Sequence, residues 1–356
     1  MSRSVAILVA LGAALCASLL SYALSLVSIR LARRAGVVKQ TGGRHIHAAP
    51  VPEWGGLGIA VTLIIVALGA YLIVPEVFVQ LSFVQILGYL AGVAILLIGG
   101  LIDDKKPLPA KVQILFPIVA ALCVIASKTG IVQVTHPLAS GGFSLVWWKV
   151  GGLSLPSDAL TFVWIVAATY ATKVLDGLDG LVTGEAVIGA SIVGALTLST
   201  AFFQPAVAIF AAIVGGAFLG FLPRNAHPAK QFLGESGSTI AGFSLAVLSI
   251  LSSAKVAVAL AVLAIPMSDV ALVMIGRIVR GVPWYKGDNT HLHFRLLQAG
   301  LSQRSAVLLL WGVSFASGLL ALTLQTRGKI FLIVTLVAST ALASFVAGLK
   351  SIQKQK

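Results

Sequence analysis

Long apolar runs alternate with short polar segments along the whole chain of 356 residues. Eleven runs are long enough, or nearly so, to cross a bilayer as helices of about 20 residues. We expect them near residues 5–29, 54–74, 84–102, 110–127, 158–175, 182–200, 203–222, 237–253, 255–276, 304–324 and 329–349. Some of these runs are short, so ten spans remain an alternative. The pattern predicts an all-α integral membrane protein, with a single domain over residues 1–356.

Composition supports the same class. Hydrophobic residues make up 58% of the chain and charged residues 10%, and the mean hydropathy is +1.02. These values lie far outside the range of soluble globular proteins. The two cysteines, Cys16 and Cys123, fall in separate predicted spans and imply neither a disulfide nor a metal site.

Basic residues predict the orientation of the chain. With the N-terminus outside and the C-terminus in the cytoplasm, nineteen of the 25 Lys and Arg residues fall in inner loops or at inner helix ends. The net charge of +14 therefore describes mainly the inner face. A cationic inner surface fits anionic lipid headgroups or a phosphorylated substrate. Nucleic acid is a poor partner, because the basic residues sit in short loops between spans.

Acidic residues are scarce, and nine of the eleven fall on the same inner face. A carboxylate beside a bilayer is costly, so it usually binds a cation, pairs with a base or does chemistry. Asp103 and Asp104 end the third apolar run, and adjacent carboxylates of this kind suit Mg²⁺, which prefers oxygen ligands. A solvated helix end balanced by Lys105, Lys106 and Lys111 is the alternative.

Two further acidic motifs lie on this face. In KVLDGLDGL, Asp176 and Asp179 are three residues apart, which would put both carboxylates on one side of a helical turn. In NAHPAKQFLGESGS, Glu235 lies in a turn of small residues at a helix start, a setting that suits phosphate or metal–phosphate binding. A plain polar turn and a plain helix cap are the respective alternatives.

Histidine and arginine supply the remaining candidates. His291, His293 and Arg295 lie in GDNTHLHFRLL, where a diphosphate clamp or an amphipathic loop helix would fit. Arg44 and His47 lie in the first inner loop and could hold a lipid phosphate, or be ordinary basic flanks. Asp269, inside the ninth apolar run, is a functional candidate with helix pairing as its rival.

Together and in this order, the motifs resemble the polyprenyl-phosphate N-acetylhexosamine-1-phosphate transferase family, the group of the WecA, TagO and MraY enzymes. The matches are RHIHAAPVPEWGG, LIDDKKPLPAK, DGLDGL, NAHPAKQFLGESGS, the PxxD of IPMSD, and HLHFRLL. The resemblance implies transfer of a sugar 1-phosphate from a UDP-N-acetylhexosamine to a polyprenyl phosphate in the cell inner (plasma) membrane. It also implies an active site on the cytoplasmic face and a Mg²⁺ cofactor, with Mn²⁺ as an alternative.

The resemblance assigns a role to each candidate residue. Asp103 or Asp104 would act as a base or position the lipid phosphate, and Asp176 and Asp179 would organise the metal and the nucleotide. Glu235 would be a metal ligand together with Asp176 and Asp179. The residues expected to bind substrate are Arg44, His47, Lys111, Lys173, Asn225, His291, His293 and Arg295.

Three positions depart from the family pattern. Glu235 stands where Asp is usual, Phe294 where a third His is common, and Lys173 where Asn is expected. The HLHFR arrangement favours the WecA/TagO side, with a phospho-MurNAc-pentapeptide transferase as the alternative. A secondary transporter and an inactive polyprenyl-phosphate-binding protein are rivals from other classes. The sugar and the oligomeric state, including a homodimer, stay open.

Overall fold

The computed structural model describes residues 1–39, 50–136, 141–151, 153–252, 256–282 and 290–354. Over these residues the chain is mainly helical, which confirms the predicted all-α class. The α-helices are α1 (Arg3–Arg34), α2 (Gly55–Ile73), α3 (Phe83–Lys105), α4 (Ala110–Gln113), α5 (Leu115–Ala126), α6 (Leu155–Leu175), α7 (Leu181–Thr197), α8 (Pro205–Asn225), α9 (Gly234–Leu251), α10 (Val256–Val262), α11 (Ala264–Val279), α12 (Leu292–Gln298), α13 (Gln303–Thr323) and α14 (Thr326–Lys354).

Short elements complete the described chain. Two 3₁₀ helices are present, η1 (Pro75–Gln80) and η2 (Thr200–Phe202). Six short strands form three antiparallel pairs: β1 (Val38–Lys39) with β2 (Val51–Pro52), β3 (Gln133–Thr135) with β4 (Gly142–Ser144), and β5 (Lys149–Val150) with β6 (Leu153–Ser154).

Each predicted span overlaps a helical segment of the described chain. Eight described helices are long and apolar enough to cross a membrane, namely α1, α2, α3, α6, α8, α9, α13 and α14. The bent pair α10–α11 is a ninth candidate, and the shorter apolar segments are α7 and the run Ala110–Ala126. The protein is therefore a multi-pass membrane protein, while the count of eleven crossings stays a prediction.

Two of the predicted spans are broken by prolines. The span predicted at 255–276 consists of α10 and α11, which bend by 73° at their junction. α10 ends at Val262, four residues before Pro266, and α4 ends at Gln113, four residues before Pro117. Proline has no backbone N–H to donate to the carbonyl four residues earlier, and its ring clashes with that carbonyl. The proline positions thus explain both breaks.

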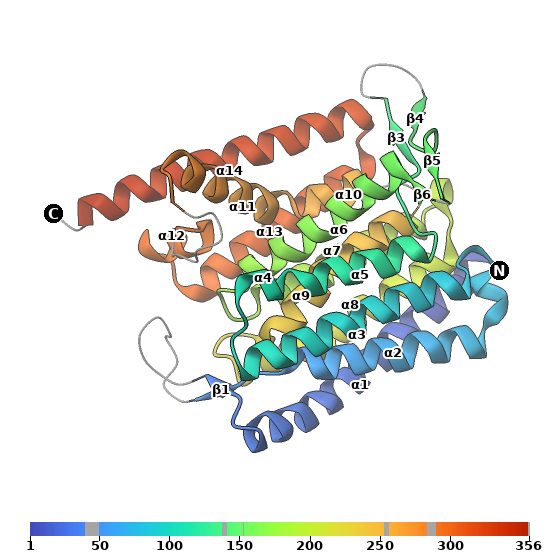
Figure 1. The fold of residues 1–356 in the computed structure, drawn as a ribbon, viewed down its shortest axis with the longest axis horizontal. Coiled ribbons are helices and arrows are strands. Elements are labelled where there is room, and N and C mark those ends of the chain that lie inside the picture. The colour runs from blue at the N-terminus through green and yellow to red at the C-terminus, as the bar shows by residue number, and fades with distance from the viewer. Residues whose placement is uncertain (40–49, 137–140, 152, 253–255, 283–289, 355–356) are drawn as a thin grey trace.

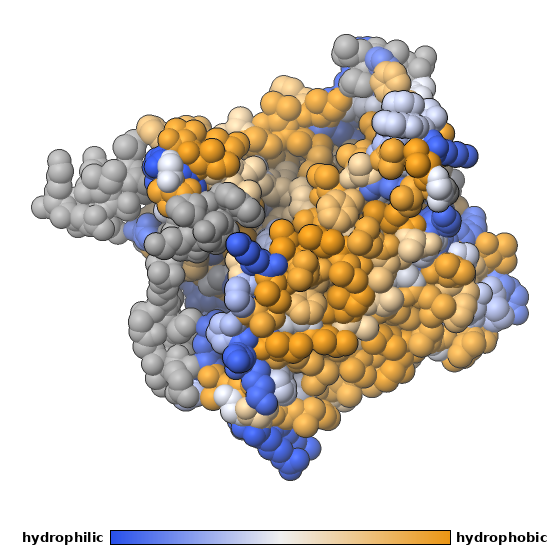
Figure 2. Space-filling view, viewed as in Figure 1, coloured by the Kyte–Doolittle hydropathy of each residue, from blue (hydrophilic) through white to orange (hydrophobic). Residues whose placement is uncertain are grey.

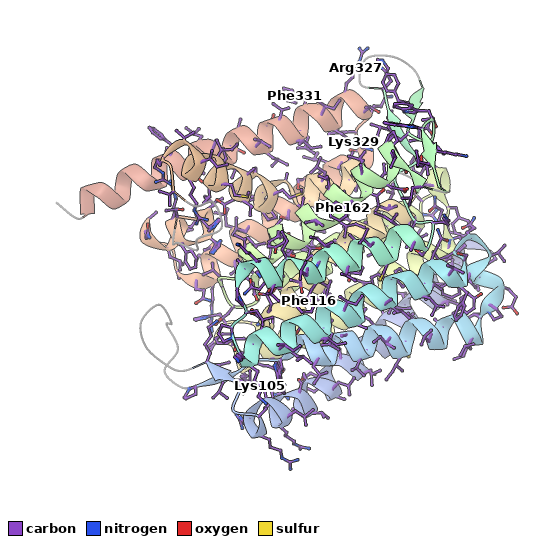
Figure 3. The ribbon with its side chains drawn as sticks, in the orientation of Figure 1. Lys105, Phe116, Phe162, Arg327, Lys329 and Phe331 are labelled. Atoms are coloured by element: carbon purple, nitrogen blue, oxygen red, sulfur yellow. The ribbon has the colours of Figure 1, made fainter. Side chains whose placement is uncertain are left out.

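The helices run side by side between the two ends of the bundle (Figure 1). The β1–β2 pair, α4 and α12 lie at one end, and the N-terminus lies with the β3–β6 strands at the other. Figure 2 shows a broad hydrophobic surface between these ends, and Figure 3 places Lys105 and Arg327 at opposite ends of it. Apolar flanks between polar ends are the arrangement that a bilayer requires.

α9 is the central helix of the bundle. In its apolar window 89% of the residues are buried, compared with 11% for α14. Glycines let α2 and α3 approach the start of α9 closely: a Cβ added at Gly56 would lie 2.3 Å from the backbone nitrogen of Gly237, and one at Gly100 would lie 2.2 Å from that of Ser236. Larger residues cannot fit at these crossings, so the glycines bring the acidic motifs together.

Candidate active site

Three helix ends that carry predicted site residues meet at the end of the bundle that contains β1 and α12. The backbone N–H of Glu235, in the first turn of α9, donates to Oδ1 of Asp104 at the end of α3, with 2.8 Å between the atoms. Gly234 has a φ of +75°, and a Cβ there would lie 2.6 Å from Oδ2 of Asp104. Asp104 therefore caps the N-terminus of α9, where a negative charge interacts favourably with the positive end of the helix dipole.

A polar network joins four helices at the same end. Lys173 on α6 forms an ion pair with Oε1 of Glu235, and its Nζ also donates to Oε1 of Gln113, 2.8 Å away. Gln113 in turn donates from Nε2 to Oδ1 of Asp103 across 2.9 Å, and the N–H of Leu108 donates to the same oxygen at 2.6 Å. The structure thus brings Asp103, Asp104, Lys173 and Glu235 together.

The two carboxylates of the DGLDG motif lie in different surroundings. α6 ends at Leu175 and Gly180, with a φ of +80°, precedes α7, so the motif is a turn rather than helix. Asp179 is buried, and its Oδ2 accepts from the N–H of Ala229 at 3.0 Å and lies 2.8 Å from Nδ1 of His227. Asp176 is exposed. The prediction that both carboxylates share one side of a helical turn is wrong, because the glycines end the helix.

Asn225, predicted to bind substrate, is buried and held by the protein. Its Oδ1 accepts from the N–H of Gly180 at 3.1 Å and from the hydroxyl of Thr183 at 2.6 Å. Its Nδ2 donates to the carbonyl oxygen of Gln231 at 3.1 Å. Asn225 therefore fixes the DGLDG turn against the segment that leads into α9.

The HLHFR motif lies against the DGLDG turn. Nδ1 of His291 lies 2.9 Å from Oδ2 of Asp269, whose other oxygen accepts from the N–H of Leu292 at 2.9 Å. The buried Asp269 thus pairs with a neighbouring element and caps α12. A Cβ added at Gly177 would lie 2.3 Å from Nε2 of His293, so the two motifs are in direct contact.

His293 is 1% exposed, and neither ring nitrogen has a hydrogen-bond partner among the described residues. Burial lowers the pKa of His293 to about 4, so its ring is neutral at pH 7. A neutral imidazole carries one N–H donor and no charge. His293 can therefore offer a hydrogen bond to a phosphate oxygen, but not a positive charge.

Arg295 already has partners within the protein. Its Nε donates to the carbonyl oxygen of Thr290 at 2.5 Å, and its Nη1 donates to that of Ser344 on α14. The bond to Ser344 ties α12 to the last helix. Lys111 is exposed on α4, and Arg44 and His47 lie outside the described residues.

Three contacts were missed by the sequence analysis. Gln113 bridges Asp103 and Lys173, His227 lies against Asp179, and Lys39 in β1 pairs with Glu53 at 3.4 Å. Gln113 and Lys39 belong to none of the motifs, and their only signal is a polar side chain beside an apolar run. His227 belongs to NAHPAKQFLGESGS, but its spacing from Asp179 carries no signal of contact.

The proposed metal ligands are not grouped around one point. Among the described residues, no three His, Cys, Asp or Glu side chains lie close enough together to hold a metal ion. Glu235 faces the Lys173 ammonium, and Asp179 faces His227 and the N–H of Ala229. In this arrangement the predicted trio does not fit a metal ion.

A small pocket lies at the polar network, and its lining includes Asp103, Gln113, Phe116 and Glu235. A larger open groove of about 440 Å³ lies between α13 and α14, is mainly apolar, and is lined by none of the predicted site residues. We place the site at the polar network, because phosphate groups require charged partners.

Comparison with known proteins agrees with the motifs. The family model described as glycosyl transferase family 4 matches residues 86–253. A Bacillus subtilis protein named "Probable undecaprenyl-phosphate N-acetylglucosaminyl 1-phosphate transferase" is 30% identical over 331 residues, which cover 90% of this chain and 87% of that protein.

Two other relatives have related names. A decaprenyl-phosphate N-acetylglucosaminephosphotransferase of Mycobacterium tuberculosis is 31% identical over 79% of this chain and 74% of its own length. A phospho-N-acetylmuramoyl-pentapeptide-transferase of Desulfotalea psychrophila is 30% identical over 89% of this chain and 93% of its own length. These matches extend over most of the chain. The chain belongs to glycosyl transferase family 4, within the polyprenyl-phosphate N-acetylhexosamine-1-phosphate transferase group.

Proposed function

We propose that this enzyme transfers N-acetylglucosamine 1-phosphate from UDP-N-acetylglucosamine to undecaprenyl phosphate or another polyprenyl phosphate. The products are a polyprenyl diphosphate sugar and UMP, and the reaction is the first membrane step of a cell-envelope glycan in the plasma membrane. The observation that carries the proposal is the meeting of Asp103, Asp104, Lys173 and Glu235 at one polar end of an apolar bundle. One substrate has a hydrocarbon tail and the other is water-soluble, so their site must lie at such a boundary.

The lipid phosphate can attack without help from a base. The second pKa of a phosphate monoester is about 6, so this group is largely ionised at pH 7. Its oxygen forms a bond to the sugar-bearing phosphorus of the donor, while the bond from that phosphorus to the UMP oxygen breaks. The protein then has to position and neutralise the phosphates. In this scheme Asp103 and Asp104 hold the geometry of the site.

The substrate contacts are distributed over several motifs. We propose that Lys173 and Lys111 neutralise phosphate oxygens, and that His293 donates one hydrogen bond to the diphosphate. Asp176, which is exposed at the DGLDG turn, would face the nucleotide. Asn225, His291 and Arg295 would act by positioning, because their side chains bind protein groups. Arg44 and His47 keep their predicted role at the lipid phosphate.

Enzymes of this family are metal-dependent. We propose Mg²⁺ as the ion, with Mn²⁺ as an alternative, since both bind phosphate and carboxylate oxygens. When bound, the ion would neutralise phosphate charge. Glu235 is the carboxylate we expect it to contact, but Lys173 already occupies one Glu235 oxygen.

The test is release of UMP by the purified protein with UDP-N-acetylglucosamine, undecaprenyl phosphate and Mg²⁺. We expect turnover in the wild type and a loss of about 100-fold in Glu235→Gln, since removing a preorganised charge at a site of this kind costs about 10²–10³. Glu76→Gln is the matched control, because Glu76 is an exposed carboxylate on η1. Equal losses in both variants would remove Glu235 from the site.

A panel of donors separates the alternatives. UMP release only with a UDP-MurNAc-pentapeptide donor would favour the phospho-MurNAc-pentapeptide transferase, the name carried by the Desulfotalea relative. No UMP from any UDP-hexosamine would contradict the proposed function. The bent pair α10–α11 is a feature that also suits a transporter. Substrate flux across liposomes without UMP release would then favour that class.

A further inference from the structure

Two of the three departures from the family pattern form a single contact. Lys173 stands where the resemblance expects Asn, and Glu235 stands where it expects Asp. In the structure the ammonium of Lys173 is paired with Oε1 of Glu235. The extra methylene of Glu lengthens its reach, and the lysine supplies a charge that an amide lacks. The two departures are therefore matched to each other in both length and charge.

The surroundings of Lys173 form a site for its ammonium group. Besides Glu235, Nζ donates to Oε1 of Gln113 at 2.8 Å and lies 5.5 Å from the centre of the Tyr170 ring. Both partners of the ion pair are about four-fifths buried, with side-chain exposures of 19% for Lys173 and 21% for Glu235. A carboxylate, an amide oxygen and an aromatic face all favour a cation at this point. Gln113 is itself held by Asp103.

A divalent ion at Glu235 would meet this resident charge. Mg²⁺ or Mn²⁺ binds a carboxylate oxygen at about 2.0–2.2 Å, so an ion on Glu235 would lie within a few ångströms of the lysine ammonium. Two like charges at such separations repel strongly where the surroundings are partly buried. Metal binding therefore requires either that Lys173 leaves Glu235 or that the ion is held less tightly.

We propose that Lys173 is a resident cation of this active site, which competes with the divalent metal for Glu235 and shares its task of neutralising phosphate. The inference rests on the proposed function, because the task that it gives to Lys173 is to neutralise phosphate groups during the transfer. It accounts for the cation that already faces Glu235, the predicted metal ligand on α9. It also makes a specific statement about affinity, because removal of the lysine charge must strengthen metal binding.

The experiment is a titration of the purified full-length protein with Mn²⁺ alone, in which free Mn²⁺ is followed by electron paramagnetic resonance. We expect the Kd for Mn²⁺ to fall at least about tenfold in Lys173→Asn, because a nearby repulsive charge is lost. Lys173→Arg keeps the charge and should stay near the wild-type Kd. Lys149→Asn is the control. It makes the same change in net charge at an exposed residue of strand β5 and should leave the Kd for Mn²⁺ unchanged.

A double variant tests whether Lys173 affects metal binding through Glu235. In Lys173→Asn/Glu235→Gln the gain in affinity should disappear, since the two side chains act through one contact. An unchanged Kd in folded Lys173→Asn, or a gain that survives Glu235→Gln, would overturn the proposal. Lys173→Gln is the second neutral variant, for use if Lys173→Asn elutes as an aggregate. The titration contains neither UDP-sugar nor lipid, so a failure of the transferase assay leaves its result intact.

Discussion

Several charged side chains of the candidate site first serve to fix its geometry. Asp104 caps α9, Asp179 holds the segment around Ala229, and Asp269 orients His291. Each of these carboxylates accepts at least one backbone N–H, which compensates for its partial or full burial. His293 is different, because both of its ring nitrogens are without a partner among the described residues. The hydrogen bonds of its ring are therefore available to a ligand.

The low pKa of His293 predicts a pH dependence of stability. The folded protein takes up this proton only near pH 4, whereas the unfolded chain takes it up near pH 6.5. The free energy of unfolding should therefore fall as the pH drops from 6.5 to 4, by about 3 kcal/mol at most. His293→Gln removes this contribution, so its apparent Tm should fall less between pH 7 and pH 4.5 than that of the wild type.

His136→Gln is the control for this prediction. His136 lies beside the β3–β4 pair and stacks on Phe143, far along the chain from the site. We expect its Tm to follow the wild-type pH profile. A His293→Gln profile parallel to that of the wild type would contradict the prediction, because it would mean that the pKa of His293 in the folded protein is not lowered.

Among the elements, the start of α9 decides where Glu235 lies. α2 and α3 press against it through Gly56 and Gly100, and Asp104 caps it. The backbone of Ser236 therefore has no room to move toward α3. Glu235 precedes Ser236, so a shift of this turn would also change the ion pair with Lys173.

Gly100→Ala tests this contact. The new Cβ would lie 2.2 Å from the backbone nitrogen of Ser236, so backbone must shift, at a cost of about 1–3 kcal/mol. We expect a lower Tm and a loss of UMP release. Gly69→Ala, on α2, has no atom within 4 Å of its added Cβ and should raise stability by about 0.5–1 kcal/mol. Equal Tm values for the two variants would contradict the close packing.

The helices could be predicted from the sequence because each span is a long apolar run, and every predicted run overlaps a helical segment. The breaks near Leu263 and Ile114 could also have been predicted, from Pro266 and Pro117. The partners inside the site could not. The Gln113 bridge and the contact of Asp179 with His227 join residues 60 and 48 positions apart. Such pairs depend on how the helices pack, which no local pattern encodes.

At the scale of the whole molecule, the two polar ends differ in what they carry. The described acidic motifs lie at the end with α12 and β1, and the β3–β6 strands lie with the N-terminus (Figure 1). Which end faces the cytoplasm stays a prediction from the basic residues.

Cysteine labelling tests this orientation. In a Cys16→Ala/Cys123→Ala background, Lys105→Cys should react with a membrane-impermeant maleimide only after the membrane is opened. Lys149→Cys should react in intact cells, because it lies on the strands at the other end. Both lysines are exposed, so accessibility within the protein does not limit either reaction. The reverse pattern would invert the predicted topology.

The bond from Arg295 to the carbonyl of Ser344 has a consequence for biogenesis. α14 is synthesised after every one of the acidic and histidine motifs, yet it holds the segment that presents His293. A nascent chain that has inserted all the motifs therefore still lacks the support of α12. The bond to Ser344 is therefore the part of this support that is added last, when the final apolar helix docks beside α12.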